Sequence, residues 1–271
     1  MIDLGLQGKR VVVAGAGYNP IRAGHGRWSA QLLGAAGASV ACVDIDEGRA
    51  KAIAAEVREA GGEALPIVAD VRERDEVVRA FDEVAAEFGG VDGCVDIVGL
   101  ATWNGLLDIS PEAWDEQLRE NLTQVFLVWQ EAARRMVAQG GGGSLVALAS
   151  IDGMVAAAFH GPYGAAKAGV ISLAKTFAYE FGKYGIRANV VAPGNVGGGN
   201  MDQPVDEFAT NGINPLAAPR TIDIANSVLF LCSDLAARTT GQTLVVDGGA
   251  TTAELWGVTE DMLPALRVAL P

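Results

Sequence analysis

The sequence predicts an α/β protein in which one parallel sheet of seven strands is doubly wound, with helices on both faces. Three observations lead to this prediction. Short apolar runs alternate with helical patterns along the chain, glycines close many of these runs, and no internal repeat or interdomain linker interrupts them. Because short apolar strands alternating with helices must be covered on both faces, the pattern is typical of a Rossmann-type sheet.

The first part of the chain supplies three strands and two helices. Arg10–Ala14 is a β-branched run, and Ser39–Val43 and Ala64–Ala69 are the next apolar runs of strand length. Between the first two runs, a helix is expected over Arg27–Gly37, with its small and apolar residues facing inward. Glu47–Ala60 is a second helix, ended by two consecutive glycines.

The remainder of the chain continues the alternation. Apolar residues at helical spacing predict a helix over Asp75–Phe88, and a longer helix over Pro111–Val137 should break or bend near Glu120–Thr123. Further helices are expected over Tyr163–Tyr184 and Ile222–Cys232. The other predicted strands are Gly93–Val98, Ser144–Ala149, Arg187–Val191 and Thr243–Val246.

Length and charge limit the class of protein. The chain has 271 residues, 50% of them apolar, which suits a single domain over residues 1–271. Its formal net charge of −13 argues against nucleic-acid and anionic-membrane partners, because both need basic surfaces. Without a signal-like N-terminus or an apolar run of membrane-spanning length, the protein is expected to be cytoplasmic.

Cysteine and histidine are scarce. Cys42, Cys94 and Cys232 share no CxxC spacing and are odd in number, so no disulfide framework is indicated. His25 and His160 have no second ligand near them in the sequence, so no metal site is expected.

A glycine-rich turn follows the first predicted strand. Gly15, Gly24 and Gly26 lead into a helix, where the backbone could approach a pyrophosphate and the helix N-terminus would supply free N–H groups. Asp44 ends the second strand, where a carboxylate can accept both ribose hydroxyls of an adenine dinucleotide and would repel a 2′-phosphate. NAD is therefore expected rather than NADP.

Other interpretations of this segment stay open. The glycines could form an ordinary tight turn, Asp44 could be a solvated strand-end carboxylate, and Arg22 or Arg27 could reach a phosphate. Asp70-Val71 closes the third strand, where the carboxylate could lie at the adenine edge. Gly99 closes the fourth strand, where a bulky side chain would obstruct the cofactor.

Tyr163 and Lys167 lie four residues apart at the start of a predicted helix, so their side chains share one face. A tyrosine with a pKa of about 10 is a poor base at neutral pH, and a neighbouring ammonium group would lower that pKa toward the range of a general acid/base. Ser150 lies at the tip of the preceding strand, where its hydroxyl could bind a substrate oxygen. Other interpretations stay open here too. Tyr163 and Lys167 could be an ordinary pair on the protein surface, and Ser150 could only cap a turn or a helix.

Taken together with several further motifs, these residues give the chain a resemblance to the short-chain dehydrogenase/reductase family over about residues 8–250. Besides the residues above, the matching motifs are Asn121 in Glu-Asn-Leu-Thr, Pro193-Gly194 and the run 240–249. The resemblance implies a catalytic tetrad in which Tyr163 takes the hydroxyl proton and Ser150 polarises the substrate oxygen. Lys167 would hold the ribose and lower the tyrosine pKa, and Asn121 would anchor a relay water.

The resemblance also implies hydride transfer to nicotinamide C4, with the carboxamide meeting the backbone near Val196. The residues expected to bind the cofactor are Gly15, Gly24, Gly26, Asp44, Asp70, Val71, Gly99, Tyr163, Lys167, Pro193, Gly194 and Val196.

The chain departs from the family pattern near the cofactor. Gly15 and Gly24 enclose eight residues, more than is usual in the family, so the loop is enlarged around Tyr18–Arg22. The family's Asn-Asn-Ala-Gly is replaced by Asp96–Gly99, and a threonine after Pro-Gly is replaced by Gly198. These changes could weaken cofactor binding, but they leave the proton-transfer residues in place.

The substrate wall is expected to combine apolar and polar side chains, which suits a medium-sized alcohol or ketone. Its candidates are Trp103, Asp152, Met154, His160 and Asn195, with residues 194–220 as a substrate loop. Trp103 could instead pack in the core, Asp152 could be a turn residue, and His160 could bond the loop backbone. The C-terminal extension, residues 250–271, carries apolar side chains expected at a subunit interface. The family resemblance implies a homo-oligomer, a tetramer or dimer, of which we expect the homotetramer.

The leading hypothesis is an NAD-dependent secondary-alcohol dehydrogenase or ketone reductase. A non-catalytic dinucleotide-binding regulator is an alternative, supported only by the altered segment Asp96–Gly99 and the enlarged loop. Enoyl reductase, dehydratase or epimerase chemistry is another. The spacing of thirteen between Ser150 and Tyr163 favours carbonyl and alcohol chemistry instead.

Overall fold

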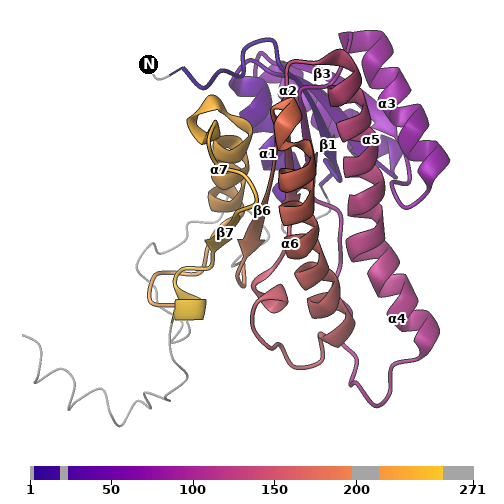
Figure 1. Cartoon of the computed structure of the whole chain (residues 1–271), viewed down its shortest axis with the longest axis vertical. Helices are drawn as coiled ribbons and strands as arrows, with labels where there is room; N and C mark the ends of the chain where they lie inside the picture. Colours follow the sequence, from indigo (N-terminus) through magenta and orange to yellow (C-terminus); the bar gives the residue numbers. More distant parts are fainter. Residues whose placement is uncertain (1–2, 19–23, 197–213, 253–271) are drawn as a thin grey trace, which may run out of the picture.

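A computed structural model describes residues 3–18, 24–196 and 214–252, and it shows one parallel sheet (Figure 1). In this part of the chain the seven strands follow the order β3-β2-β1-β4-β5-β6-β7. The strands are β1 (Arg10–Ala14), β2 (Ser39–Asp44), β3 (Glu63–Val68), β4 (Gly93–Asp96), β5 (Gly143–Leu148), β6 (Ile186–Pro193) and β7 (Thr243–Val246). The strand order reverses between β1 and β4, which opens a crevice at their carboxyl ends.

Helices cover both faces of the sheet, as predicted (Figure 1). They are α1 (His25–Ala35), α2 (Glu47–Glu59), α3 (Arg74–Phe88), α4 (Pro111–Leu118), α5 (Gln124–Gln139), α6 (Gly161–Phe181) and α7 (Thr221–Cys232). Apolar side chains of α1, α2 and α7 pack on one face, and those of α3, α5 and α6 pack on the other. The sheet is therefore doubly wound.

The two apolar cores follow from the alternation of side chains along each strand. In β1, Val12 joins the core under α3, α5 and α6, whereas Val11 and Val13 join the core under α1, α2 and α7. Trp129 of α5 is fully buried and meets Phe177 of α6 edge to face, with ring centroids 5.4 Å apart. Successive residues of β1 thus contact the apolar cores on opposite faces of the sheet.

The long helix predicted over Pro111–Val137 is interrupted where a break was expected. A π-helical turn, Arg119–Thr123, separates α4 from α5. Such turns widen the backbone spacing locally and recur at functional sites. Here the turn carries Asn121.

Most other boundaries differ from prediction by one or two residues, for local reasons. The helix expected over Arg27–Gly37 begins at His25, because Gly24 adopts a left-handed φ of 69° and turns the chain into it. The strand expected over Gly93–Val98 ends at Asp96, whose carboxylate accepts the Val98 N–H at 3.1 Å and bends the chain away. The short 3₁₀ turns at Ile151–Gly153 and Asp234–Ala236 were not predicted.

Several predictions lie outside the described residues. These include Arg22, Gly198, most of the loop 194–220 and the extension beyond residue 252. None of the helices in the described ranges is long and apolar enough to cross a membrane.

Candidate active site

A cavity of about 1000 Å³ lies at the carboxyl ends of the central strands. It is lined by almost all residues predicted for the cofactor, catalytic and substrate sites, from the glycine turn at Gly15 to Val196. Two predicted residues do not line it. Asn121 is fully buried behind the wall, and Met154 is 48% exposed. The cavity therefore unites the predicted cofactor turn with the predicted proton-transfer residues.

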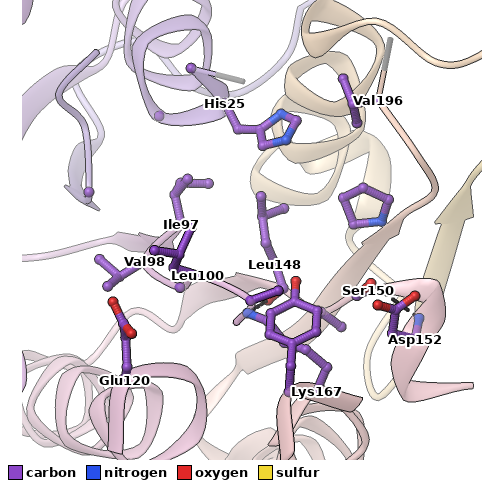
Figure 2. A pocket seen from close by; sticks show the side chains of 18 of the residues that line it. His25, Ile97, Val98, Leu100, Glu120, Leu148, Ser150, Asp152, Lys167 and Val196 are labelled. Carbon is purple, nitrogen blue, oxygen red and sulfur yellow. Dashed lines mark hydrogen bonds between the residues drawn. The ribbon is translucent and has the colours of Figure 1, made fainter. Parts of the chain in front are cut away.

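Tyr163 and Lys167 enter the cavity from the first turns of α6, which begins with a Gly-Pro pair suited to a helix start. Lys167 is buried, and its Nζ donates a 2.8 Å hydrogen bond to the Leu148 carbonyl at the end of β5. The same Nζ lies 5.6 Å from the centroid of the Tyr163 ring. Figure 2 shows Lys167, Leu148 and Ser150 around one part of the pocket. The pair is therefore an interior pair and not a surface pair.

The two side chains have strongly shifted pKa values. Burial raises the pKa of Tyr163 to about 12, with a contribution from Asp152, while a hydrogen bond with Ser150 acts to lower it. Burial lowers the pKa of Lys167 to about 8, against the opposing effects of Asp96 and Glu120. Among the protein's own groups, burial thus outweighs the expected lowering of the tyrosine pKa by lysine. Paired perturbations of this kind in a cavity mark a candidate acid/base site.

Ser150 serves both as a cap and as a wall of the cavity. Its Oγ accepts the Asp152 N–H at 3.1 Å, which caps the 3₁₀ turn at Ile151–Gly153. Because this bond uses an oxygen lone pair, the hydroxyl proton stays available for its neighbour Tyr163 or for a substrate oxygen. The turn cap considered from the sequence is thus compatible with a substrate contact.

Asn121 fixes the loop that follows β4. Its Nδ2 donates to the carbonyls of Leu100 and Gln117 at 3.1 and 3.0 Å, and its Oδ1 accepts the Leu100 N–H at 3.0 Å. Gly99 has a φ of 151°, and a β-carbon there would lie 2.6 Å from Asn121 Oδ1 and 2.9 Å from Lys167 Nζ. A side chain at Gly99 would therefore displace two of the predicted catalytic residues.

The glycine turn has the close packing that a dinucleotide needs. A β-carbon on Gly26 would collide with the Gly15 carbonyl, and one on Gly15 would lie 2.9 Å from Val98. The α1 N-terminus at His25 opens onto the cavity (Figure 2). His25 Nδ1 is buried and has no hydrogen-bond partner in the described part of the chain. This narrow cradle lies at the start of α1, where the first backbone N–H groups of a helix have no partner within the helix, and it fits a pyrophosphate group.

The carboxylates beside this turn are already paired with arginines. Asp44 accepts Arg49 Nη2 at 2.8 Å and the Gly17 N–H at 3.0 Å. Asp70 accepts Arg72 Nη2 at 2.7 Å, and this hydrogen bond helps to lower the Asp70 pKa. Sequence reasoning missed both arginines. Their positions, five and two residues after the carboxylates, were the available signal.

A buried carboxylate ends β4, directly before the cavity-lining residues Ile97 and Val98. Asp96 is 1% exposed, accepts Gln124 Nε2 at 3.2 Å, and has an Oδ2 atom without a partner among the residues that the structure describes. Burial raises its pKa to about 6. Within residues 3–18, 24–196 and 214–252, no cluster of three or more His, Cys, Asp or Glu side chains could hold a metal ion.

Comparison with known proteins gives consistent matches over nearly the whole chain. A family model described as enoyl-(acyl carrier protein) reductase matches residues 21–251. The chain is 32% identical over 253 residues to 2,5-dichloro-2,5-cyclohexadiene-1,4-diol dehydrogenase of Sphingobium indicum, covering 91% of this chain and 98% of that protein. It is 35% identical over 254 residues to L-rhamnose 1-dehydrogenase (NAD(P)(+)) of a Sphingomonas species, covering 90% and 96% of the two chains.

Solved structures agree with these matches. The fold is similar to the crystal structure of a short-chain type dehydrogenase/reductase from Mycobacterium marinum, with a TM-score of 0.83 and 32% identity. That similarity covers 93% of this chain and 98% of the other.

Proposed function

Because the chain belongs to the short-chain dehydrogenase/reductase family, we propose that it is an NAD-dependent secondary-alcohol dehydrogenase or ketone reductase. One observation carries the proposal. Ser150, Tyr163 and Lys167 line the same cavity as the glycine turn, so a substrate oxygen and a dinucleotide can lie side by side.

The chain's own residues would move the proton. Ser150 donates a hydrogen bond to the substrate oxygen, and the Tyr163 oxygen takes the hydroxyl proton as the carbonyl forms. Bound NAD supplies the hydride acceptor and a positive charge that would offset the raised Tyr163 pKa. Lys167, held by Leu148, would bind the ribose. Asn121 does not line the cavity, so in place of the expected relay water its role would be to hold the Leu100 backbone, which does. The alcohol loses one hydride from carbon and one proton from oxygen, and ketone reduction reverses both transfers.

Asp44 supports NAD rather than NADP, because its carboxylate lies at the end of β2 on the cavity wall. Arg49 opposes this preference, since it pairs with Asp44 and could turn toward a 2′-phosphate. We expect the carboxylate to prevail, because it is held by the Gly17 and Asp46 N–H groups as well as by Arg49. We also propose that the chain forms a single domain, is cytoplasmic, and assembles as a homotetramer or dimer.

The test is NAD⁺ reduction by the purified protein with a panel of secondary alcohols, followed by absorbance. Because oxidation needs the Tyr163 phenolate, kcat/KM for alcohol oxidation should rise by up to about tenfold per pH unit at pH values below the apparent pKa. The kcat/KM for ketone reduction should not rise with pH, because reduction needs the protonated tyrosine. Turnover with NADP⁺ in preference to NAD⁺ would overturn the cofactor assignment.

Two other outcomes identify the alternatives. Tight NAD binding without turnover of any alcohol or ketone would favour a non-catalytic regulator. Oxidation of NADH by an enoyl thioester, with no reaction of ketones, would favour the chemistry named in the family description.

A further inference from the structure

A second polar pair faces the cavity next to Tyr163. His160 Nδ1 lies 2.7 Å from Asp152 Oδ2, and the two side chains are only 13% and 16% exposed. Both residues line the same cavity as Ser150 and Tyr163. Figure 2 shows Asp152 beside Ser150 on one wall of the pocket. The proton-transfer chemistry described above leaves this pair without a role.

The imidazole ring is held in place from three sides. It meets Trp103 edge to face, with ring centroids 4.1 Å apart, and meets Tyr163 with centroids 5.8 Å apart. Asp152 is itself anchored, because its N–H donates to Ser150 Oγ. His160 is therefore a preorganised group, fixed relative to the tyrosine that would receive the substrate proton.

The hydrogen bond to Asp152 decides what the other ring nitrogen can do. A carboxylate only accepts, so Nδ1 carries the proton and, in the neutral imidazole, Nε2 presents a lone pair. Nε2 is buried and has no hydrogen-bond partner among the described residues. Buried polar atoms are nearly always paired, so an unpartnered acceptor on a residue that lines the cavity calls for a ligand donor. An aliphatic hydroxyl group is such a donor.

We propose that His160 accepts a hydrogen bond from a second hydroxyl group of the substrate, so that the enzyme selects polyols, cyclic diols or sugars over simple secondary alcohols. The inference rests on the proposed dehydrogenase function and names its substrate class. Asp152 acts as a positioning residue that fixes the imidazole tautomer. The relatives named for a cyclohexadiene diol and for rhamnose act on compounds that carry more than one hydroxyl group.

The experiment compares cyclohexane-1,2-diol and cyclohexane-1,4-diol with cyclohexanol as substrates of the full-length enzyme with NAD⁺. A site built to bind a hydroxyl rejects the analogue that lacks it, so at least one diol should exceed cyclohexanol in kcat/KM by about 100-fold or more. His160→Phe keeps an aromatic ring but removes Nε2, and it should reduce this ratio to within about tenfold of unity. Val155→Ala, an exposed neighbour outside the cavity lining, is the matched control and should keep the ratio.

Asp152 is tested by two variants, of which only the first is conservative. Asp152→Asn keeps an oxygen that accepts from Nδ1–H and should retain most of the diol preference. Asp152→Ala frees the tautomer and should lower the preference, mainly by raising the KM for the diol. These variants also keep the proposal testable if His160→Phe does not fold.

The outcomes separate this inference from the proposed function. If no alcohol is oxidised, the proposed function fails. If cyclohexanol and the diols are oxidised equally well, or if His160→Phe keeps the ratio, only the role of His160 is wrong. A preference for a hydroxy acid over every diol would also overturn the proposed role of His160. The imidazole would then donate a hydrogen bond to a carboxylate as a charged group, instead of accepting one from a hydroxyl group.

Discussion

The two sides of the cavity are held together by different interactions. On the proposed catalytic side, Lys167 bonds the Leu148 carbonyl at the end of β5, and Ser150 accepts the Asp152 N–H of the 3₁₀ turn that follows, so backbone groups set both positions. On the cofactor side, the carboxylates of Asp44 and Asp70 are held by arginines that are 34% and 30% exposed. Changes on the catalytic side should therefore affect turnover, whereas changes on the cofactor side should affect affinity and cofactor choice.

The largest expected effect comes from removing the Tyr163 hydroxyl. Tyr163→Phe takes away the proton acceptor and should lower kcat/KM for alcohol oxidation by about 10²- to 10⁴-fold. NADH binding, measured by fluorescence titration, should change little, because the ring and Lys167 remain. The control is Tyr179→Phe on the same helix, since Tyr179 is 92% exposed. Full activity of Tyr163→Phe would show that the proposed proton transfer is wrong.

Cofactor choice should respond to the charge of Asp44. Asp44→Asn keeps an oxygen for the Gly17 N–H but removes the repulsion of a 2′-phosphate and releases Arg49 to bind it. The ratio of kcat/KM for NADP⁺ to that for NAD⁺ should rise by about 10- to 100-fold, the range expected for one charge at close range. Asp46→Asn, two residues away, removes the same charge and keeps the helix cap, so it should leave the ratio unchanged. An unchanged ratio in Asp44→Asn would remove Asp44 from cofactor selection.

The fold was largely predictable because local pattern and global topology agree in this chain. Strands β1 and β7 have the predicted bounds, and the break near Glu120–Thr123 appears as the π-helical turn Arg119–Thr123. Boundaries failed where a side chain or a glycine overrides the pattern. Asp96 ends β4 by bonding the Val98 N–H, and Gly24 starts α1 early.

The sequence predicted the candidate site only where the position of a residue in a helix or strand is enough to place it. Tyr163, Lys167 and Ser150 follow from helix and strand geometry, and the structure brings them to one cavity. The pairing of Asp44 with Arg49, and that of His160 with Asp152, depends on side-chain conformation in three dimensions. The sequence shows which groups are near one another along the chain, but not which rotamers bring their polar atoms together.

Asp96 is buried at the end of β4 and should limit stability at neutral pH. Its pKa is about 6 instead of 3.8, so the folded state holds the proton more tightly than the unfolded chain does. Stability is then lost as the pH rises from 3.8 to about 6, at a cost of up to about 3 kcal/mol.

Asp96→Asn, which restores the residue usual in the family, removes this cost. The free energy of unfolding at neutral pH should rise by about 1–3 kcal/mol, as measured by urea denaturation. The gain should shrink as the pH falls through the same window. A loss of stability at neutral pH that disappears at acidic pH would mean that the Asp96 charge is stabilising, contrary to the direction of its pKa.

The smallest effects should come from the caps of two helices. One is α2, whose first turn lies next to Asp44 on the cofactor side, and the other is α4, which does not line the cavity. Asp46 caps α2 by accepting the Arg49 N–H at 2.8 Å, and Ser110 caps α4 by accepting the Ala113 N–H at 3.2 Å. Asp46→Ala and Ser110→Ala should each cost about 1 kcal/mol of unfolding free energy. Because Arg49 lies in the first turn of α2, only Asp46→Ala should also change the Kd for NADH, by severalfold. Equal Kd values in the two variants would mean that the start of α2 does not position Arg49 and Asp44 for the cofactor.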